Sequence, residues 1–225
     1  MGAGFQGFPP EALRFLRQLK RNNNREWFLA HKQTYEEKVK APMTELVTAV
    51  GGAMQGFAPE IESDPKKAIY RIYRDIRFSA DKSPYKTHSA AFFAPRGMPK
   101  NSCAGLYFHI APDELILAGG IYMPDAATLR SLRQYIAGQW EQLAAITESP
   151  GFKRLFGGLQ GERLVRPPRG SPADHPAAEL LRYKQYIVWV EHDPAFAETP
   201  KFFPSLLKHF AAMMPLVRYL NRGLK

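Results

Sequence analysis

The stretch AGLYFHIAPDELILAGGIY, residues 104–122, decides the fold class of this 225-residue chain. Its two halves, 104–111 and 114–122, are rich in aromatic and branched side chains and are bounded by turn-forming residues, which predicts two strands. Pro112 and Asp113 favour a tight turn between them. The sequence therefore predicts an antiparallel hairpin near the middle of the chain.

Strand signals also occur on both sides of this hairpin. The same residue types, bounded by proline, glycine and aspartate, predict further strands over 68–74, 88–94, 164–165 and 186–191. Gly119 and Gly120, inside the second hairpin strand, indicate a bulge or a close approach of another backbone segment.

Helical patterns flank the strands. Apolar residues recur at helical spacing, which predicts helices over 8–19, 27–39, 43–54, 125–143, 152–156 and 206–220. Pro42 and Pro215 favour breaks or kinks, because proline cannot donate a backbone hydrogen bond. Asp125 is a typical N-cap residue. Asn23, with Glu26 three residues on, resembles a capping box.

These elements predict an α+β fold, because helices near both ends surround a central, mostly antiparallel sheet. We expect a single domain over residues 1–225, without an internal repeat or a linker. Its parts would be a helical segment 1–57, a strand-rich core 68–122, and a segment 125–225 that combines helices with further strands.

Composition narrows the class of protein. Hydrophobic residues make up 45% and charged residues 23%, which is ordinary for a globular protein. No apolar run reaches the roughly 18 residues of a membrane span, and the N-terminus lacks the pattern of a secretory signal. The single cysteine, Cys103, excludes a disulfide framework and a multi-cysteine metal site. We expect a cytoplasmic protein without a membrane partner, a metal or a cofactor.

The net charge of +10 is concentrated in two segments. Residues 66–88 hold seven lysines and arginines against two aspartates, and residues 201–225 hold five against none, so each carries a local charge of +5. Basic clusters of this kind attract anions over long distances. An anionic ligand is therefore the first class of partner to consider.

The first basic segment contains RIYRDIRFSADKSPYKTH, residues 71–88. Two carboxylates, Asp75 and Asp81, cannot neutralise five cations, so three positive charges remain. Arginine supplies planar paired donors to an oxyanion and lysine a compact charge. Alternatively, the two aspartates belong to a structural ion-pair network that pins the loop to the sheet. The candidate anion-binding residues are Arg71, Arg74, Arg77, Lys82 and Lys86.

Three residues of this stretch are candidates for catalysis: His88, Asp75 and Tyr85. Nearby cations disfavour the protonated form of His88, which suits a general base, although a strand-edge histidine bonded to backbone is an alternative. The same cations keep Asp75 ionised, which suits ion pairing better than proton donation. Tyr85 could donate a hydrogen bond to a substrate oxyanion. The spacing of the six histidines matches no tight metal motif.

One run of the basic stretch reads Arg71-x-x-Arg74-Asp75-x-Arg77-Phe78 and is followed by Asp81-Lys82-x-x-Tyr85. This motif resembles the hallmark of a widespread family of conserved hypothetical bacterial proteins, also found embedded in some fungal proteins. The resemblance covers nearly the whole chain. The family is a domain of unknown function, so the resemblance implies an α+β fold and marks the motif residues, but implies no activity or cofactor. Further matching positions are Phe15-Leu16, Asn23 to Phe28, Tyr35, Pro42, Gly119-Gly120-x-Tyr122 and Pro124.

Three functions remain open. The first is an enzyme or sensor for a small phosphorylated or carboxylated molecule bound at residues 71–88. The second is a nucleic-acid-binding module whose basic surface combines these residues with Arg163, Arg166, Arg169 and the C-terminal helix; its affinity would fall steeply with salt. The third is a non-catalytic scaffold, in which Arg74→Ala would unfold the protein.

Overall fold

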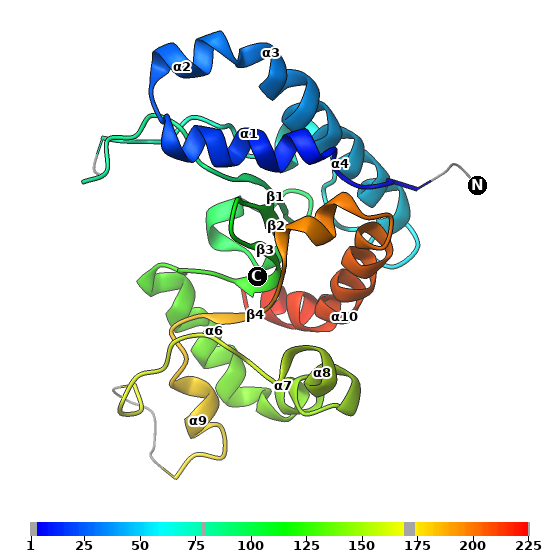
Figure 1. The fold of residues 1–225 in the computed structure, drawn as a ribbon. Coiled ribbons are helices and arrows are strands. Elements are labelled where there is room, and N and C mark those ends of the chain that lie inside the picture. Colours follow the sequence, from blue (N-terminus) through cyan, green and yellow to red (C-terminus); the bar gives the residue numbers. More distant parts are fainter. Residues whose placement is uncertain (1–3, 78–79, 169–173, 225) are drawn as a thin grey trace. The chain divides into compact units, whose positions relative to one another are not determined.

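The computed structural model describes residues 4–77, 80–168 and 174–224 (Figure 1). Four strands form one antiparallel sheet in the order β1-β2-β3-β4, and helices flank it, so the predicted α+β class is confirmed. The strands are β1 (Ser89–Phe93), β2 (Gly105–Ile110), β3 (Leu115–Ile121) and β4 (Tyr186–His192).

The chain groups into two compact units. The first comprises Met1–Phe93, Tyr107–Leu117 and Glu191–Lys208, and the second comprises Ala94–Leu106, Ala118–Val190 and His209–Lys225. Strands β2, β3 and β4 contribute residues to both units. A single domain over 1–225 stays a prediction.

The first unit begins with a series of helices, drawn in blue to cyan in Figure 1. Asn24, not Asn23, caps α2: its side chain accepts a hydrogen bond from the Trp27 backbone N–H at 2.9 Å. Pro42 is the second residue of α4, and the helical backbone continues into it from a π-helical turn, η1, so the predicted break is a change of helix type. These helices are α1 (Pro10–Arg21), α2 (Arg25–Ala30), α3 (Lys32–Thr34), η1 (Tyr35–Lys40), α4 (Ala41–Met54) and α5 (Pro65–Ala68).

The remaining helices follow β1 along the chain. Asp125 caps α6 as predicted, and accepts a hydrogen bond from the Thr128 N–H at 2.7 Å. The last helix begins a turn earlier than predicted and contains Pro215. The elements are η2 (Lys100–Ser102), α6 (Ala126–Gly138), α7 (Trp140–Thr147), α8 (Pro150–Phe156), α9 (Ala178–Leu181), η3 (Pro194–Glu198) and α10 (Phe202–Arg222).

Two predicted strands are wrong. Over 68–74 the chain leaves α5 and pairs with 85–91 only at isolated bridges, Ile69 with Ala91 and Tyr73 with Tyr85. Pro84 accepts a hydrogen bond from the Arg74 N–H but has no N–H to return, so a regular ladder cannot form.

The predicted strand 164–165 likewise reduces to one bridge, between Arg163 and Tyr183. Leu164 donates its N–H to the Arg182 carbonyl, but two prolines follow at 167 and 168 and end the pairing.

The predicted central hairpin is confirmed as β2 and β3, closed by a hydrogen bond from the Ala111 N–H to the Glu114 carbonyl. Along β2, burial alternates: Leu106, Phe108 and Ile110 are fully buried, whereas Tyr107 and His109 are half-buried. Phe108 packs at 6.4 Å, ring centre to ring centre, against Phe202 of α10. One side of β2 therefore faces the core, and the other presents polar side chains.

The glycine pair of β3 marks a close backbone approach, as the sequence predicts. A Cβ added to Gly120, which has φ of +122°, would lie 2.1 Å from the Tyr186 carbonyl oxygen of β4. A side chain at this position would collide with the neighbouring strand.

Candidate functional site

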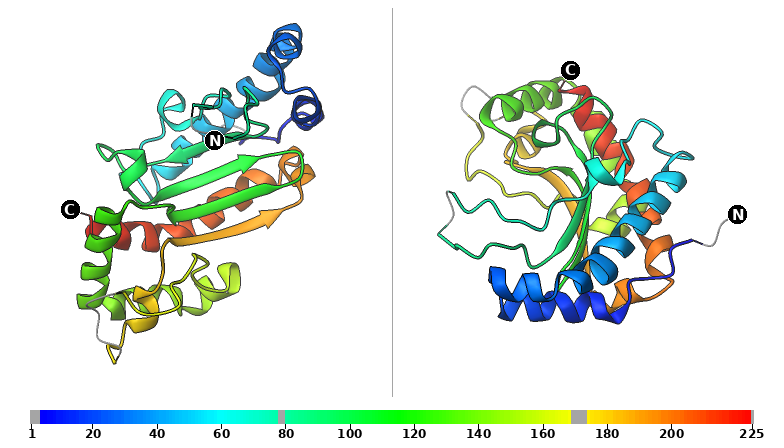
Figure 2. Two further views of the ribbon diagram at one scale, coloured as in Figure 1. Left: turned by 90° about the vertical axis from the view of Figure 1, so that its left-hand side faces the viewer. Right: turned by 90° about the horizontal axis from the view of Figure 1, so that it is seen from above.

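Residues 69–77 and 80–88, which lie between α5 and β1, form a long excursion that we call the arm (Figures 1 and 2). Two contacts anchor it to the N-terminal helices. The Asn23 side chain accepts a hydrogen bond from the Tyr85 N–H at 3.1 Å and donates one to the Tyr85 carbonyl at 2.9 Å. The Tyr85 ring, only 4% exposed, stacks on Phe28 with 4.0 Å between ring centres.

This packing places the three candidate catalytic residues differently. Tyr85 lies within an aromatic cluster, where burial raises the pKa of its hydroxyl. Asp75 is exposed and His88 is half-buried. Tyr85 therefore anchors the arm, and only the other two remain open to a ligand.

Each aspartate of the arm is paired with one arginine. Arg77 holds Asp75 with two hydrogen bonds of 3.0 and 2.7 Å, and Arg74 forms an ion pair with Asp81. Hydrogen bonds from Arg77 lower the pKa of Asp75. Hydrogen bonds from Ser83, followed by Arg74, lower the pKa of Asp81 to about 2. Both carboxylates are therefore ionised at neutral pH and act as ion-pair partners, in line with the sequence interpretation.

The other three cations of the arm have no ion pair among the described residues. Lys82 donates to the Ile76 carbonyl at 3.0 Å, and Lys86 donates to the Arg71 carbonyl at 3.1 Å. The Lys86 ammonium also lies 5.0 Å from the centre of the Tyr70 ring. Burial, followed by the charge of Arg71, lowers the pKa of Lys86. The positive charge that the sequence left in excess is thus carried by Arg71, Lys82 and Lys86.

His88 ends the arm beside a second histidine. Its ring centre lies 5.3 Å from that of His109 on β2. Burial, followed by the charges of His109 and Lys86, lowers the pKa of His88 to about 4; Arg74 adds to this effect and Glu114 opposes it. His88 is therefore neutral at pH 7, as the sequence predicts, but burial rather than charge is the main cause. A base this weak is poorly matched to proton transfer at neutral pH.

Lowering the pH is expected to destabilise the protein in part through His88. Its pKa, about 4 in the folded protein, is below the 6.5 of a free histidine, so the unfolded state binds more protons between these values. Stability is full above about pH 6.5 and falls as the pH falls towards 4, by at most about 3 kcal/mol for this residue. Urea denaturation at pH 7 and pH 4.5 should show a smaller loss for His88→Gln than for the parent; equal losses would contradict the assignment.

Three residues that the sequence analysis did not select form a hydrogen-bonded chain beside His88. The Tyr107 hydroxyl lies 3.0 Å from His109 Nδ1, and His109 Nε2 lies 3.0 Å from Glu114 Oε1. Tyr107 and His109 are alternate residues on the polar side of β2, and Glu114 immediately precedes β3. Alternation of polar aromatic residues along the hairpin strand was the signal that could have found them.

The structure also bears on the cysteine and on the metal and membrane sites that were considered from the sequence. Cys103 is buried, and burial raises the pKa of its thiol to about 11, which argues against a nucleophile. Among the described residues, no group of three histidine, cysteine, aspartate or glutamate side chains is arranged to hold a metal ion. None of the described helices has the length and apolar character needed to cross a membrane.

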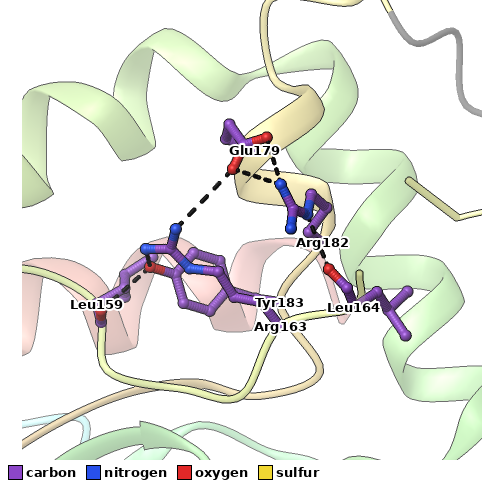
Figure 3. A network of polar contacts seen from close by, with 6 residues as sticks. All are labelled: Leu159, Arg163, Leu164, Glu179, Arg182 and Tyr183. Carbon is purple, nitrogen blue, oxygen red and sulfur yellow. Dashed lines mark hydrogen bonds and ion pairs between the residues drawn. The ribbon is translucent and has the colours of Figure 1, made fainter. Parts of the chain in front are cut away.

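Arg163, one member of the predicted nucleic-acid surface, takes part in a network of the second unit (Figure 3). Its guanidinium lies 4.5 Å from the centre of the Tyr183 ring, and its Nη1 lies 3.9 Å from Glu179 Oε2. Glu179 also binds Arg182 at 2.8 Å. Internal partners thus occupy Arg163; Arg169, another member of that surface, lies outside the described residues.

Fold and site together define an α+β protein whose basic arm lies beside a cluster of half-buried histidines. The chain belongs to the family described as conserved hypothetical protein (DUF2461), whose model matches residues 11–219. The resemblance inferred from the sequence is confirmed, and it spans nearly the whole chain. No curated protein and no solved structure matches the chain.

Proposed function

We propose that the protein binds a small phosphorylated or carboxylated molecule at the arm. One observation carries this proposal. After the two aspartates of the arm have taken Arg74 and Arg77, the cations Arg71, Lys82 and Lys86 have no carboxylate partner among the described residues. An oxyanion would supply the missing negative charge.

The immediate surroundings of Lys86 support an anion site. Its ammonium is held by a backbone carbonyl and lies against the Tyr70 ring, so it is fixed in place without being neutralised. Burial disfavours its charge, and a bound phosphate or carboxylate would favour it again. Arg71 is exposed, and its backbone carbonyl accepts the hydrogen bond from Lys86, so the two residues are neighbours that one ligand could contact.

A purely structural network explains the arm less well. The Arg74 side chain is 35% exposed and that of Asp81 is 53% exposed. Ion pairs this open to solvent contribute at most about 1 kcal/mol to stability. Arg74→Ala is therefore not expected to unfold the protein, as the scaffold hypothesis requires.

A nucleic acid is the second candidate ligand, favoured by two aromatic side chains of the arm. Tyr70 is 37% exposed and Tyr73 is 52% exposed, and they flank Arg71, which has no ion pair with any residue that the structure describes. Exposed aromatic rings beside cations offer stacking surfaces for the bases of a single strand.

We also propose that the protein acts in the cytoplasm, which the buried thiol of its single cysteine supports.

Phosphate, sulfate, sugar phosphates, nucleotides, small carboxylates and short oligonucleotides are to be compared by thermal shift at low and high salt. A ligand at about 100 times its dissociation constant stabilises the folded state by about 2.7 kcal/mol. For a chain of this size, that corresponds to a rise in Tm of roughly 5–10 °C. We expect a small anion to give such a shift, and the shift to persist at high salt.

The matched variants remove equal charge from different places. The triple variant Arg71→Ala, Lys82→Ala, Lys86→Ala is expected to abolish the shift. The control, Arg154→Ala, Lys201→Ala, Lys208→Ala, removes one arginine and two lysines that are exposed and lie outside the arm, and should retain it. A shift produced only by oligonucleotides and lost in salt would favour the second candidate. Equal shifts in both triple variants would refute binding at the arm.

A further inference from the structure

We infer that Tyr107, His109 and Glu114 form a proton relay in which His109 acts as a base and activates the Tyr107 phenol beside the anion site. The relay makes the protein an acid–base catalyst. This inference rests on the proposed function for its ligand. Tyr107 is the group that meets the ligand. His109 accepts the proton of Tyr107, and Glu114 is the positioning residue that orients His109. Both residues act through Tyr107.

The hydrogen-bonding chemistry fixes the direction of the relay. An ionised carboxylate can only accept, so Glu114 receives the N–H of His109 Nε2 across their 3.0 Å contact. The neutral imidazole then has its lone pair on Nδ1, which lies 3.0 Å from the Tyr107 hydroxyl. The phenol therefore donates to the imidazole, and the carboxylate holds the imidazole in the tautomer that can accept. The order is that of a nucleophile or acid–base group, its base, and the group that orients the base.

The relay adjoins the anion site at its Tyr107 end. The Tyr107 ring centre lies 6.5 Å from that of Tyr70, and the Lys86 ammonium lies 5.0 Å from the Tyr70 ring. His88 flanks the middle of the relay, 5.3 Å from His109 between ring centres. Tyr70 thus lies next to both Lys86 and Tyr107, and the inference requires a ligand that extends from the ammonium past the Tyr70 ring to the Tyr107 hydroxyl.

Burial keeps the proton acceptor of the relay neutral. The His109 side chain is 13% exposed, whereas that of Glu114 is 46% exposed. Burial is the main cause that lowers the pKa of His109, and Glu114 opposes it. The imidazole is consequently neutral at pH 7 with its lone pair available, and the Glu114 carboxylate, which favours the imidazolium, offsets part of the cost of burial.

The proton balance defines the class of substrate. Tyr107 passes its hydroxyl proton to His109 Nδ1, and the resulting phenolate removes a proton from the ligand; the imidazolium is stabilised by Glu114. On return, Tyr107 gives that proton to the product, and His109 then returns its own proton to the Tyr107 phenolate. The ligand therefore carries, next to its phosphate or carboxylate, a hydroxyl or a C–H group that exchanges a proton. General acid–base catalysis of this kind contributes about 10²- to 10⁴-fold to a rate.

The relay can be tested without knowing the substrate, by labelling the intact chain with an aryl sulfonyl fluoride. The phenol oxygen forms a bond to sulfur, the sulfur–fluorine bond breaks with loss of fluoride, and the phenol proton passes to His109. Peptide mass spectrometry follows each of the ten tyrosines. Tyr122, at 68% exposure, is the internal reference. Accessibility alone predicts faster labelling of Tyr122, whereas the relay predicts at least tenfold faster labelling of Tyr107.

Three variants distinguish a proton relay from a hydrogen-bonded chain with a purely structural role. His109→Gln and Glu114→Gln are expected to slow Tyr107 labelling by tenfold or more. Asp113→Asn, which removes the neighbouring carboxylate that pairs with Lys20, should leave the rate unchanged. Thermal melts of each variant confirm that it is folded at the labelling temperature. Tyr107 labelling no faster than that of Tyr122, or unaffected by His109→Gln, overturns the inference.

Inorganic phosphate distinguishes this inference from the proposed function. Phosphate bound at Lys86 is expected to protect Tyr107 from the reagent, and Lys86→Ala to abolish the protection. Fast, His109-dependent labelling without protection would uphold the relay and count against the anion site. Phosphate stabilisation with slow labelling would uphold the anion site and refute the relay.

Discussion

Tyr85→Ala is expected to lower the free energy of unfolding by about 3–5 kcal/mol, as for other large aromatic residues truncated in a core. The ring is 4% exposed and stacks on Phe28 at 4.0 Å, so its removal leaves a cavity between the arm and the N-terminal helices. The Asn23 side chain also hydrogen-bonds the backbone N–H and carbonyl of Tyr85. Both hydrogen bonds require the backbone at position 85 to keep its place, which the buried ring secures. Urea denaturation at pH 7 measures the loss.

Tyr73 provides the control for this change. It pairs with Tyr85 across the same bridge, with 5.5 Å between ring centres, but it is 52% exposed. Tyr73→Ala should therefore cost no more than about 1 kcal/mol. Tyr85→Ala should also weaken phosphate binding although it removes no cation, because it detaches the arm. Equal losses of stability in the two variants would show that Tyr85 is not the anchor.

The hairpin of β2 and β3 could be predicted because its signal is local. Aromatic and branched residues on each side of Pro112 and Asp113 favour strands, and no distant partner is needed to bring them together. The cap at Asp125 is local for the same reason, since its acceptor contact is with the third residue on. Sequence patterns of such short range predict the structure correctly here, because the outcome does not depend on contacts with residues far along the chain.

Asn23 illustrates where local reasoning fails. Asn23 and Asn24 are adjacent and chemically identical, so each satisfies the preference for an N-cap. The choice depends on Tyr85, 62 residues further along, which takes the amide of Asn23. The predicted strand 68–74 fails for a related reason: its pairing partner contains Pro84, whose effect on the ladder emerges only when the two segments meet.

The candidate site was predictable in its charge but not in its geometry. Counting charges gave the surplus of three cations, but which arginine pairs with which aspartate depends on the path of the arm between them. His109 was considered only for metal-ligand spacing along the chain. Its partners lie two residues before it and five residues after it, the latter across a turn, a spacing unlike that of a metal-binding H-E-x-x-H motif.

Gly120→Ala is expected to lower the free energy of unfolding by about 4 kcal/mol or more, because backbone strain and a backbone collision add up at this position. Positive φ of +122° is strained for any residue with a side chain, which costs about 1–3 kcal/mol. The new Cβ would also lie 2.1 Å from the Tyr186 carbonyl oxygen and 2.9 Å from the Ile187 Cα. Both are backbone atoms of β4, so relief requires the strands to separate rather than a side chain to turn.

Gly52→Ala is the matched control, because it adds the same methyl group where the structure has room. Gly52 lies within α4, is exposed, and an added Cβ would meet nothing within 4 Å. Alanine should raise stability there by about 0.5–1 kcal/mol, since glycine lowers helix stability and loses more backbone entropy on folding. Thermal and urea unfolding of both variants give the comparison, with soluble yield as the readout if Gly120→Ala fails to fold. A Gly120→Ala protein as stable as the parent would mean that β3 and β4 do not approach each other as described.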